Sequence, residues 1–92
     1  MAKTYNNIGN VLQKLGKLEE ALEMFQKSLD IKRQVFSDNH VSVADTLFNM
    51  SMIYDNIGDE SKGLELTRRA HSICVVALGP DHPKTKNYAR FI

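Results

Sequence analysis

The second half of this 92-residue chain repeats its first half with an offset of 42 positions. Several residues are identical in the two halves, and these pairs include Ala2/Ala44, Thr4/Thr46, Asn7/Asn49, Gly16/Gly58, Leu22/Leu64, Glu23/Glu65, Ile31/Ile73 and His40/His82. A period in this range is typical of solenoid proteins, in which each unit stacks on its neighbour. Such proteins present an extended surface rather than one reactive residue, so the central question is what lies on that surface.

Each unit is predicted to be a pair of helices. Apolar residues of the first unit recur every three or four positions, the spacing of one buried helix face, at Tyr5, Ile8, Val11, Leu12 and Leu15. Gly16 ends this helix, because glycine adopts the left-handed cap conformation easily, and a second helix is expected from about Leu18 to Phe36. The second unit repeats this pattern around Gly58. A fifth helix is expected to start near Pro83, and the sequence has no clear strand pattern.

The expected fold class is therefore all-α, an antiparallel helix-pair solenoid that forms a single domain over residues 1–92. Two full repeats are expected at 2–43 and 44–85, followed by a partial repeat or capping helix at 86–92. Because the first residue falls close to a repeat boundary, one alternative is that the chain is a fragment of a longer array.

Composition narrows the classes of partner. The formal net charge of +1 gives no support to a general nucleic-acid binder, which needs a basic face. No apolar run approaches the length of a membrane span, so no membrane partner is expected and a cytoplasmic location is the default. The only cysteine, Cys74, cannot form an internal disulfide. It aligns with Lys32, at a position expected to be exposed or at an edge between units.

No motif predicts an enzyme or a cofactor. A nucleophile elbow, a phosphate loop and a paired acid–base pattern are all missing from the sequence. His40 and His82 occupy matching loops, but no further Cys or His completes a metal site, so a loop or cap hydrogen bond is expected for both. The basic pairs Lys32-Arg33 and Arg68-Arg69 are interpreted as solvated faces of the second helices, toward the convex side, and the alternative is that an acidic partner uses them.

Particular residue types also stand at fixed places within each unit. In the first unit these are Tyr5, Ile8-Gly9, Leu12, Gly16, Ala21, Phe25 and Ser28, and in the second Leu47, Met50-Ser51, Tyr54, Gly58, Gly63, Thr67 and Ala70. This arrangement resembles the tetratricopeptide repeat, whose ordinary period is 34 residues. The longer period here, together with the related segments 36–40 and 78–83, resembles the repeat of the kinesin light chain type.

The resemblance implies a non-catalytic scaffold that binds a peptide or protein segment on a concave face lined by the first helix of each unit. The positions carried over to this face are Asn6, Asn7, Asn10, Gln13 and Lys14 in the first unit and Phe48, Asn49, Met52, Asp55 and Asn56 in the second. Carboxamides both donate to and accept from a peptide backbone, and Phe48 with Met52 is expected to form an apolar pocket for one anchor residue. A clamp for a C-terminal carboxylate is not expected, because Asn6 stands at its first lysine position. The asparagines could instead form a solvated helix face, and Asn7 could hydrogen-bond within the helix pair.

Self-association is the alternative function. Solenoids generally need three or more units to be stable, and this chain has two units and part of a third. Its apolar ends could therefore pack against a second copy, either by end-to-end stacking or by exchange of the last helix. The candidate residues for a homo-oligomer are Tyr5, Ile8, Leu12, Tyr88, Phe91 and Ile92. The last three could also cover the open end of the stack within one chain.

Overall fold

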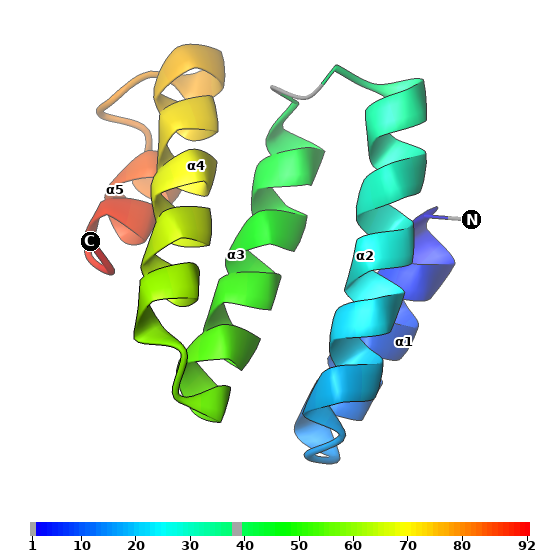
Figure 1. Ribbon diagram of the computed structural model, residues 1–92. Helices are drawn as coiled ribbons and strands as arrows, with labels where there is room; N and C mark the ends of the chain where they lie inside the picture. The colour runs from blue at the N-terminus through cyan, green and yellow to red at the C-terminus, as the bar shows by residue number, and fades with distance from the viewer. Residues whose placement is uncertain (1, 38–39) are drawn as a thin grey trace.

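The computed structural model describes residues 2–37 and 40–92, and all the regular elements in these ranges are α-helices. They are α1 (Ala2–Lys14), α2 (Leu18–Val35), α3 (Val41–Ile57), α4 (Glu60–Leu78) and α5 (Pro83–Ala89). The all-α helix-pair fold that the repeat predicted is confirmed: α1 packs on α2 and α3 packs on α4, and α2 joins the two pairs by packing on α3 (Figure 1).

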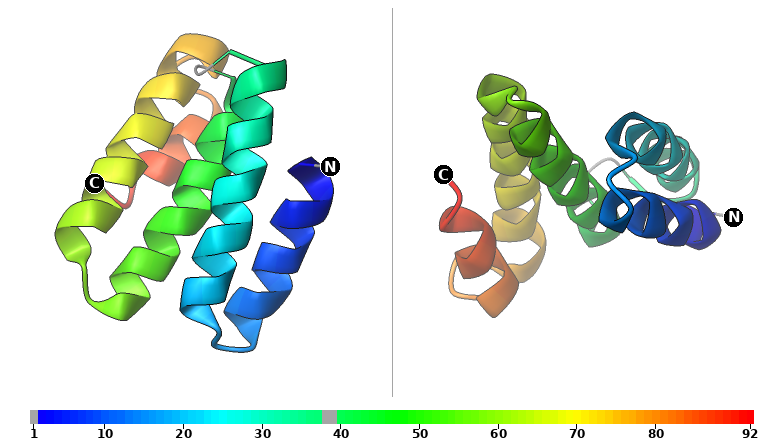
Figure 2. Two further views of the ribbon diagram at one scale, coloured as in Figure 1. Left: turned by 45° about the vertical axis from the view of Figure 1, so that its right-hand side comes forward. Right: turned by 90° about the horizontal axis from the view of Figure 1, so that it is seen from below.

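The helix α5 takes the place of the first helix of a third unit. It begins at Pro83, and α3 begins at Val41, 42 positions earlier, so the two helices correspond in the repeat. Figure 2 shows α5 at the end of the molecule away from α1, against the pair formed by α3 and α4. The chain therefore has two junctions between units, one among α1, α2 and α3 and one among α3, α4 and α5.

Glycine and histidine residues set the limits of the helices. Gly16 and Gly58 have φ angles of +80° and +100°, the left-handed conformation that the sequence predicted for the turns inside each unit. His40 and His82 each cap the helix that follows. The Nδ1 atom of His40 accepts a hydrogen bond from the Ser42 N–H at 3.0 Å, and that of His82 accepts one from the Lys84 N–H at 3.1 Å. The predicted loop or cap role of both histidines is confirmed.

The stripe predicted for α1 is only partly buried. Tyr5 and Leu12 are half-buried, but Ile8, Val11 and Leu15 are 41%, 57% and 67% exposed, so the prediction of one buried face was wrong for these three. Their counterparts in α3 explain the difference. Met50 and Ile53, which correspond to Ile8 and Val11, are buried in a helix that packs on both α4 and α2, whereas α1 packs chiefly on α2.

Gly9 allows the close approach of α1 and α2. A Cβ atom at Gly9 would lie 2.9–3.0 Å from three carbons of the Phe25 ring, which is fully buried and has no room to move. The sequence identified Gly9 only as part of the repeat pattern, and the structure gives the physical reason for it. At the corresponding contact of α3 with α4, Gly63 faces the side chain of Asp55, which is exposed.

Gly9→Ala is expected to destabilise the fold by a net amount of about 1 kcal/mol, because overpacking against Phe25 outweighs the helix propensity gained by removing glycine. The variant Gly63→Ala is expected to have a smaller effect. The exposed Asp55 carboxylate can swing aside, and the Ser51 carbonyl oxygen, 3.1 Å from the added Cβ atom, needs to shift by only a few tenths of an ångström. Urea denaturation followed by circular dichroism measures both free energies of unfolding. A Gly9→Ala protein as stable as Gly63→Ala would contradict this packing argument.

Candidate functional site

The nine residues predicted to bind a peptide lie on the first helices of the two units, α1 and α3. Six of them are half-buried, and these are Asn6, Asn10, Gln13, Phe48, Asn49 and Met52. The other three, Asn7, Asp55 and Asn56, are exposed, as is Lys14. The set thus lies at the surface of α1, in which only Gly9 is fully buried, and at the surface of the more deeply packed α3.

The carboxamide side chains of this set have no hydrogen bonds to the rest of the described chain, and this holds for Asn7, Asn10, Gln13, Asn49 and Asn56. The alternative that Asn7 bonds within the helix pair is therefore wrong. Each carboxamide has two donor hydrogens and one acceptor oxygen. These groups are free to bond to water or to a ligand.

Phe48 has a different role from the predicted one. Its ring stacks on that of Tyr88 with centroids 4.4 Å apart and meets the edge of Phe91 at 5.1 Å. The ring packs inside the chain instead of lining an open pocket with Met52. The sequence could not show this, because the contact depends on where α5 docks.

The second junction, among α3, α4 and α5, is closed by a carboxylate and aromatic rings. Both oxygens of Asp45 accept from the Lys84 ammonium, at 3.0 and 3.1 Å, and one of them accepts from the Tyr88 hydroxyl at 2.6 Å. Cys74 is fully buried at this junction between units, so of the two expected positions the exposed one was wrong. Burial, and then the nearby Asp45 carboxylate, raise the pKa of its thiol. A buried thiol with a raised pKa is inert, which leaves Cys74 a packing residue.

Tyr88 is expected to make the fold sensitive to alkaline pH. Burial, and then the hydrogen bond to Asp45, raise the pKa of Tyr88 above the value of about 10 for an exposed tyrosine. Stability is complete below about pH 10 and falls above it, because the unfolded chain then releases a proton that the folded chain keeps. In Tyr88→Phe the fall should be smaller by up to about 1.4 kcal/mol per pH unit. Chemical denaturation on both sides of this pH tests the prediction, and identical pH profiles of the two proteins would contradict it.

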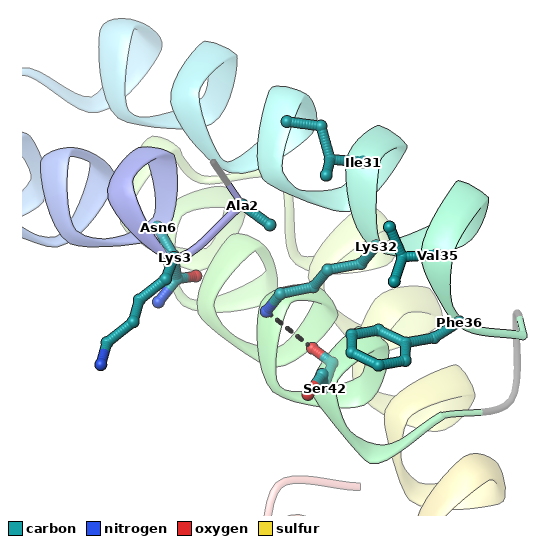
Figure 3. A pocket seen from close by; sticks show the side chains of 8 residues that line it. All are labelled: Ala2, Lys3, Asn6, Ile31, Lys32, Val35, Phe36 and Ser42. Carbon is teal, nitrogen blue, oxygen red and sulfur yellow. Dashed lines mark hydrogen bonds between the residues drawn. The ribbon is translucent and has the colours of Figure 1, made fainter.

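The first junction, among α1, α2 and α3, holds an open pocket of about 620 Å³ (Figure 3). Its lining residues are Ala2, Lys3 and Asn6 from α1, Ile31, Lys32, Val35 and Phe36 from α2 and its end, and Ser42 from α3. Of the predicted site residues, the structure brings only Asn6 to this pocket. Its Oδ1 atom is buried and accepts no hydrogen bond.

Lys32 is a functional candidate that the sequence placed only in a basic pair on the second helix, outside the predicted peptide-binding set. Its ammonium reaches across the pocket and donates to the Ser42 carbonyl oxygen at 3.1 Å and to the Thr46 hydroxyl at 2.8 Å. Burial lowers its pKa, and the Asp45 carboxylate partly opposes this. In the sequence Lys32 was interpreted as part of a solvated basic pair. A comparison of the two repeats could have revealed Lys32, because the first unit has a lysine at the position where the second unit has Cys74.

The candidates for self-association are divided by the structure. Ile8, Phe91 and Ile92 are exposed, and Leu12 is partly buried against the core. Tyr5 is half-buried, and the Lys27 ammonium lies 5.6 Å from the centre of its ring. Tyr88 is buried at 5% exposure and packs against residues of its own chain.

Two further observations concern the described ranges 2–37 and 40–92. No helix in them is long and apolar enough to cross a lipid bilayer. No three or more His, Cys, Asp or Glu side chains come together there in a way that could hold a metal ion.

Comparison with known proteins agrees with the helix-pair architecture. Residues 1–70 match the family described as "Tetratricopeptide repeat". The chain is 36% identical over 69 residues to Photosystem I assembly protein Ycf3 of Prochlorococcus marinus, an alignment that covers 75% of this chain and 37% of that protein. It is 24% identical over 92 residues to a Clustered mitochondria protein homolog of Candida albicans, covering all of this chain and 7% of that protein.

The chain thus spans well under half the length of the curated relatives it matches. Neither relative is a kinesin light chain, so the likeness of the 42-residue repeat to that type stays a prediction. The helix pairs, the glycine turns and the close contact at Gly9 agree with the match over residues 1–70. This chain belongs to the tetratricopeptide repeat family.

Proposed function

We propose that this chain is a non-catalytic interaction module that binds a short peptide or partner segment along the first helices α1 and α3. One observation carries the proposal. Asn10, Gln13 and Asn49 are half-buried on this face and make no hydrogen bond within the described chain. Partly desolvated carboxamides gain most from a ligand that supplies a donor and an acceptor, and an extended peptide backbone supplies both.

One relative is named as an assembly protein, which supports a role in holding other proteins. The shifted pKa values support a role without covalent chemistry. Burial is the first cause of each shift, and it raises the pKa of Cys74 and of Tyr88, which disfavours the charged, nucleophilic form of both side chains.

Peptides obtained by display selection against the folded chain provide the test. Replacing Asn49 with alanine is expected to weaken their binding about fivefold, the effect of one lost hydrogen bond, and Met52→Ala should weaken it similarly through lost apolar contact. Asn87→Ala is the matched control, because Asn87 is an exposed asparagine on α5. Unchanged affinity in both Asn49→Ala and Met52→Ala would overturn the proposed site.

Self-association is the second candidate, and the exposed stripe of Ile8, Val11 and Leu15 favours it. In the second unit the counterparts of Ile8 and Val11, Met50 and Ile53, are buried in a helix that packs on α2, so a helix of the same kind in a second copy could cover this part of α1. Light scattering over a wide range of concentration tests this function. A concentration-dependent mass that Val11→Lys abolishes would support it, and a constant monomer mass would end it.

A further inference from the structure

The two junctions between units are built from corresponding residues, yet the place that is an open pocket at the first junction is filled by side chains at the second. Each residue of the first junction has a counterpart 42 positions later. The pairs that differ most in chemistry are Lys3/Asp45, Asn6/Phe48, Lys32/Cys74, Ser42/Lys84 and Thr46/Tyr88. Comparison with the second junction therefore shows which side-chain groups the first junction lacks.

At the second junction the protein itself supplies a carboxylate and aromatic side chains. The Asp45 carboxylate is held by Lys84 and Tyr88, and the Phe48 ring stacks on Tyr88. At the first junction the positions of the two rings hold the small polar residues Asn6 and Thr46, and the position of the carboxylate holds Lys3. The pocket of about 620 Å³ lies at this place.

Neither Lys32 nor Lys3 forms an ion pair with a carboxylate of the described chain, although the Asp45 carboxylate is near enough to raise the pKa of Lys32 against the effect of burial. The acceptors of Lys32 are both neutral oxygens, those of Ser42 and Thr46, although its ammonium is partly withdrawn from water. Lys3 is exposed at the rim of the same pocket and forms no ion pair with a described residue. A partly buried ammonium such as that of Lys32 attracts an anion more strongly than a fully hydrated ammonium does.

The remaining walls indicate what else a ligand must carry. Ile31, Val35 and Phe36 form an apolar side of the pocket, and Val35 and Phe36 are exposed. Opposite them, the buried Oδ1 atom of Asn6 has no donor. A buried acceptor left without a donor is unfavourable, and a peptide N–H is a donor of suitable size.

We propose that the first-junction pocket binds a partner segment in which a large apolar side chain stands next to a carboxylate. The inference rests on the proposed function and names the class of peptide that the module selects. The apolar side chain lies against Val35 and Phe36, the carboxylate meets Lys32 and Lys3, and a backbone N–H of the segment donates to Asn6.

The first part of the test compares three labelled peptides on the 92-residue chain by fluorescence polarisation. They are Ser-Gly-Glu-Leu-Glu-Gly-Ser, the neutral form with Gln for both Glu, and the polar form with Ser for Leu. The acidic apolar peptide is expected to bind about tenfold more tightly than either of the others, because each of these lacks one of the two features. The difference from the neutral peptide should shrink at high salt, since the charges near the rim are then screened.

The second part locates the site. Lys32→Met keeps the apolar stem and removes the charge, so affinity for the acidic peptide should fall about tenfold and affinity for the neutral peptide should stay. Lys86→Met, at an exposed lysine of α5, is the matched control and should change neither. Val35→Asp places a negative charge on an exposed wall of the pocket. It should weaken binding of the acidic peptide without a change in the circular dichroism spectrum.

Equal affinities for the acidic and neutral peptides, or full affinity in both Lys32→Met and Val35→Asp, would overturn this inference. The proposed function survives that result if Asn49→Ala still weakens peptides from the display selection. If the three peptides and the selection all give no binding, the inference and the proposed function fail together.

Discussion

Phe25→Ala is expected to lower the free energy of unfolding by about 4 kcal/mol, which is most of the stability of a domain of this size. The Phe25 ring is fully buried and fills the space beside Gly9, where α1 has no side chain of its own. Its removal leaves a cavity that the small residues around it cannot fill, because Gly9 and the neighbouring Ala21 offer little bulk.

The matched control removes a phenylalanine from the surface. Phe36 lies at the end of α2, is exposed, and stacks only on His40 among the described rings, so Phe36→Ala should change the free energy of unfolding by less than about 1 kcal/mol. Urea denaturation monitored by circular dichroism gives both values. If Phe25→Ala and Phe36→Ala lost similar stability, Phe25 would not be the centre of the first helix pair.

Tyr88→Ala is expected to release α5 from the rest of the fold. The substitution removes a buried ring, its stacking on Phe48 and its hydrogen bond to Asp45, and only seven residues of helix remain to hold α5 in place. A loss of about 3 kcal/mol raises the fraction of open molecules about a hundredfold. Cys74 reports this opening, since it is fully buried at the same junction.

The measurement is the rate at which an aromatic disulfide reagent labels Cys74. Labelling should be about a hundredfold faster in Tyr88→Ala, because local opening controls access to a buried thiol. Tyr88→Phe keeps the ring and loses only the hydroxyl, so its labelling should stay within about tenfold of the parent protein. Equally slow labelling of all three proteins would show that α5 does not cover Cys74.

The sequence alone predicted the repeat, the helix pairs and the turns, because these depend on local spacing. The positive φ angles at Gly16 and Gly58 and the caps at His40 and His82 follow from residues within one turn of each site. The start of α5 at Pro83 has the same origin. Such features need no knowledge of how the units pack.

Features that depend on neighbouring units were harder to predict. Ile8 and Val11 form the same pattern as the buried Met50 and Ile53, and only the presence of α2 beside α3 separates the two cases. Phe48 was expected on a binding face, but its partners Tyr88 and Phe91 lie more than 39 residues further along the chain. Amphipathic spacing shows which side of a helix is apolar and leaves open what covers it.

Amphipathic spacing could not predict the pocket at the first junction. It arises where residues of α1, α2 and α3 meet, and its distinguishing residue, Lys32, looks like any surface lysine in the sequence. A residue-by-residue comparison of the repeats identifies Lys32, because a lysine and a cysteine at the same repeat position cannot pack in the same way. Differences between the repeats thus pointed to this pocket, and the features that the repeats share did not.

We propose that the chain holds a partner segment on the face formed by α1 and α3. The deciding experiment is a peptide-display selection against the folded chain, with the Asn49→Ala, Met52→Ala double variant as the parallel target. The selection is expected to enrich peptides that share an apolar residue and that are lost on the double variant. No enrichment on a folded sample, or the same peptides on both targets, would contradict it.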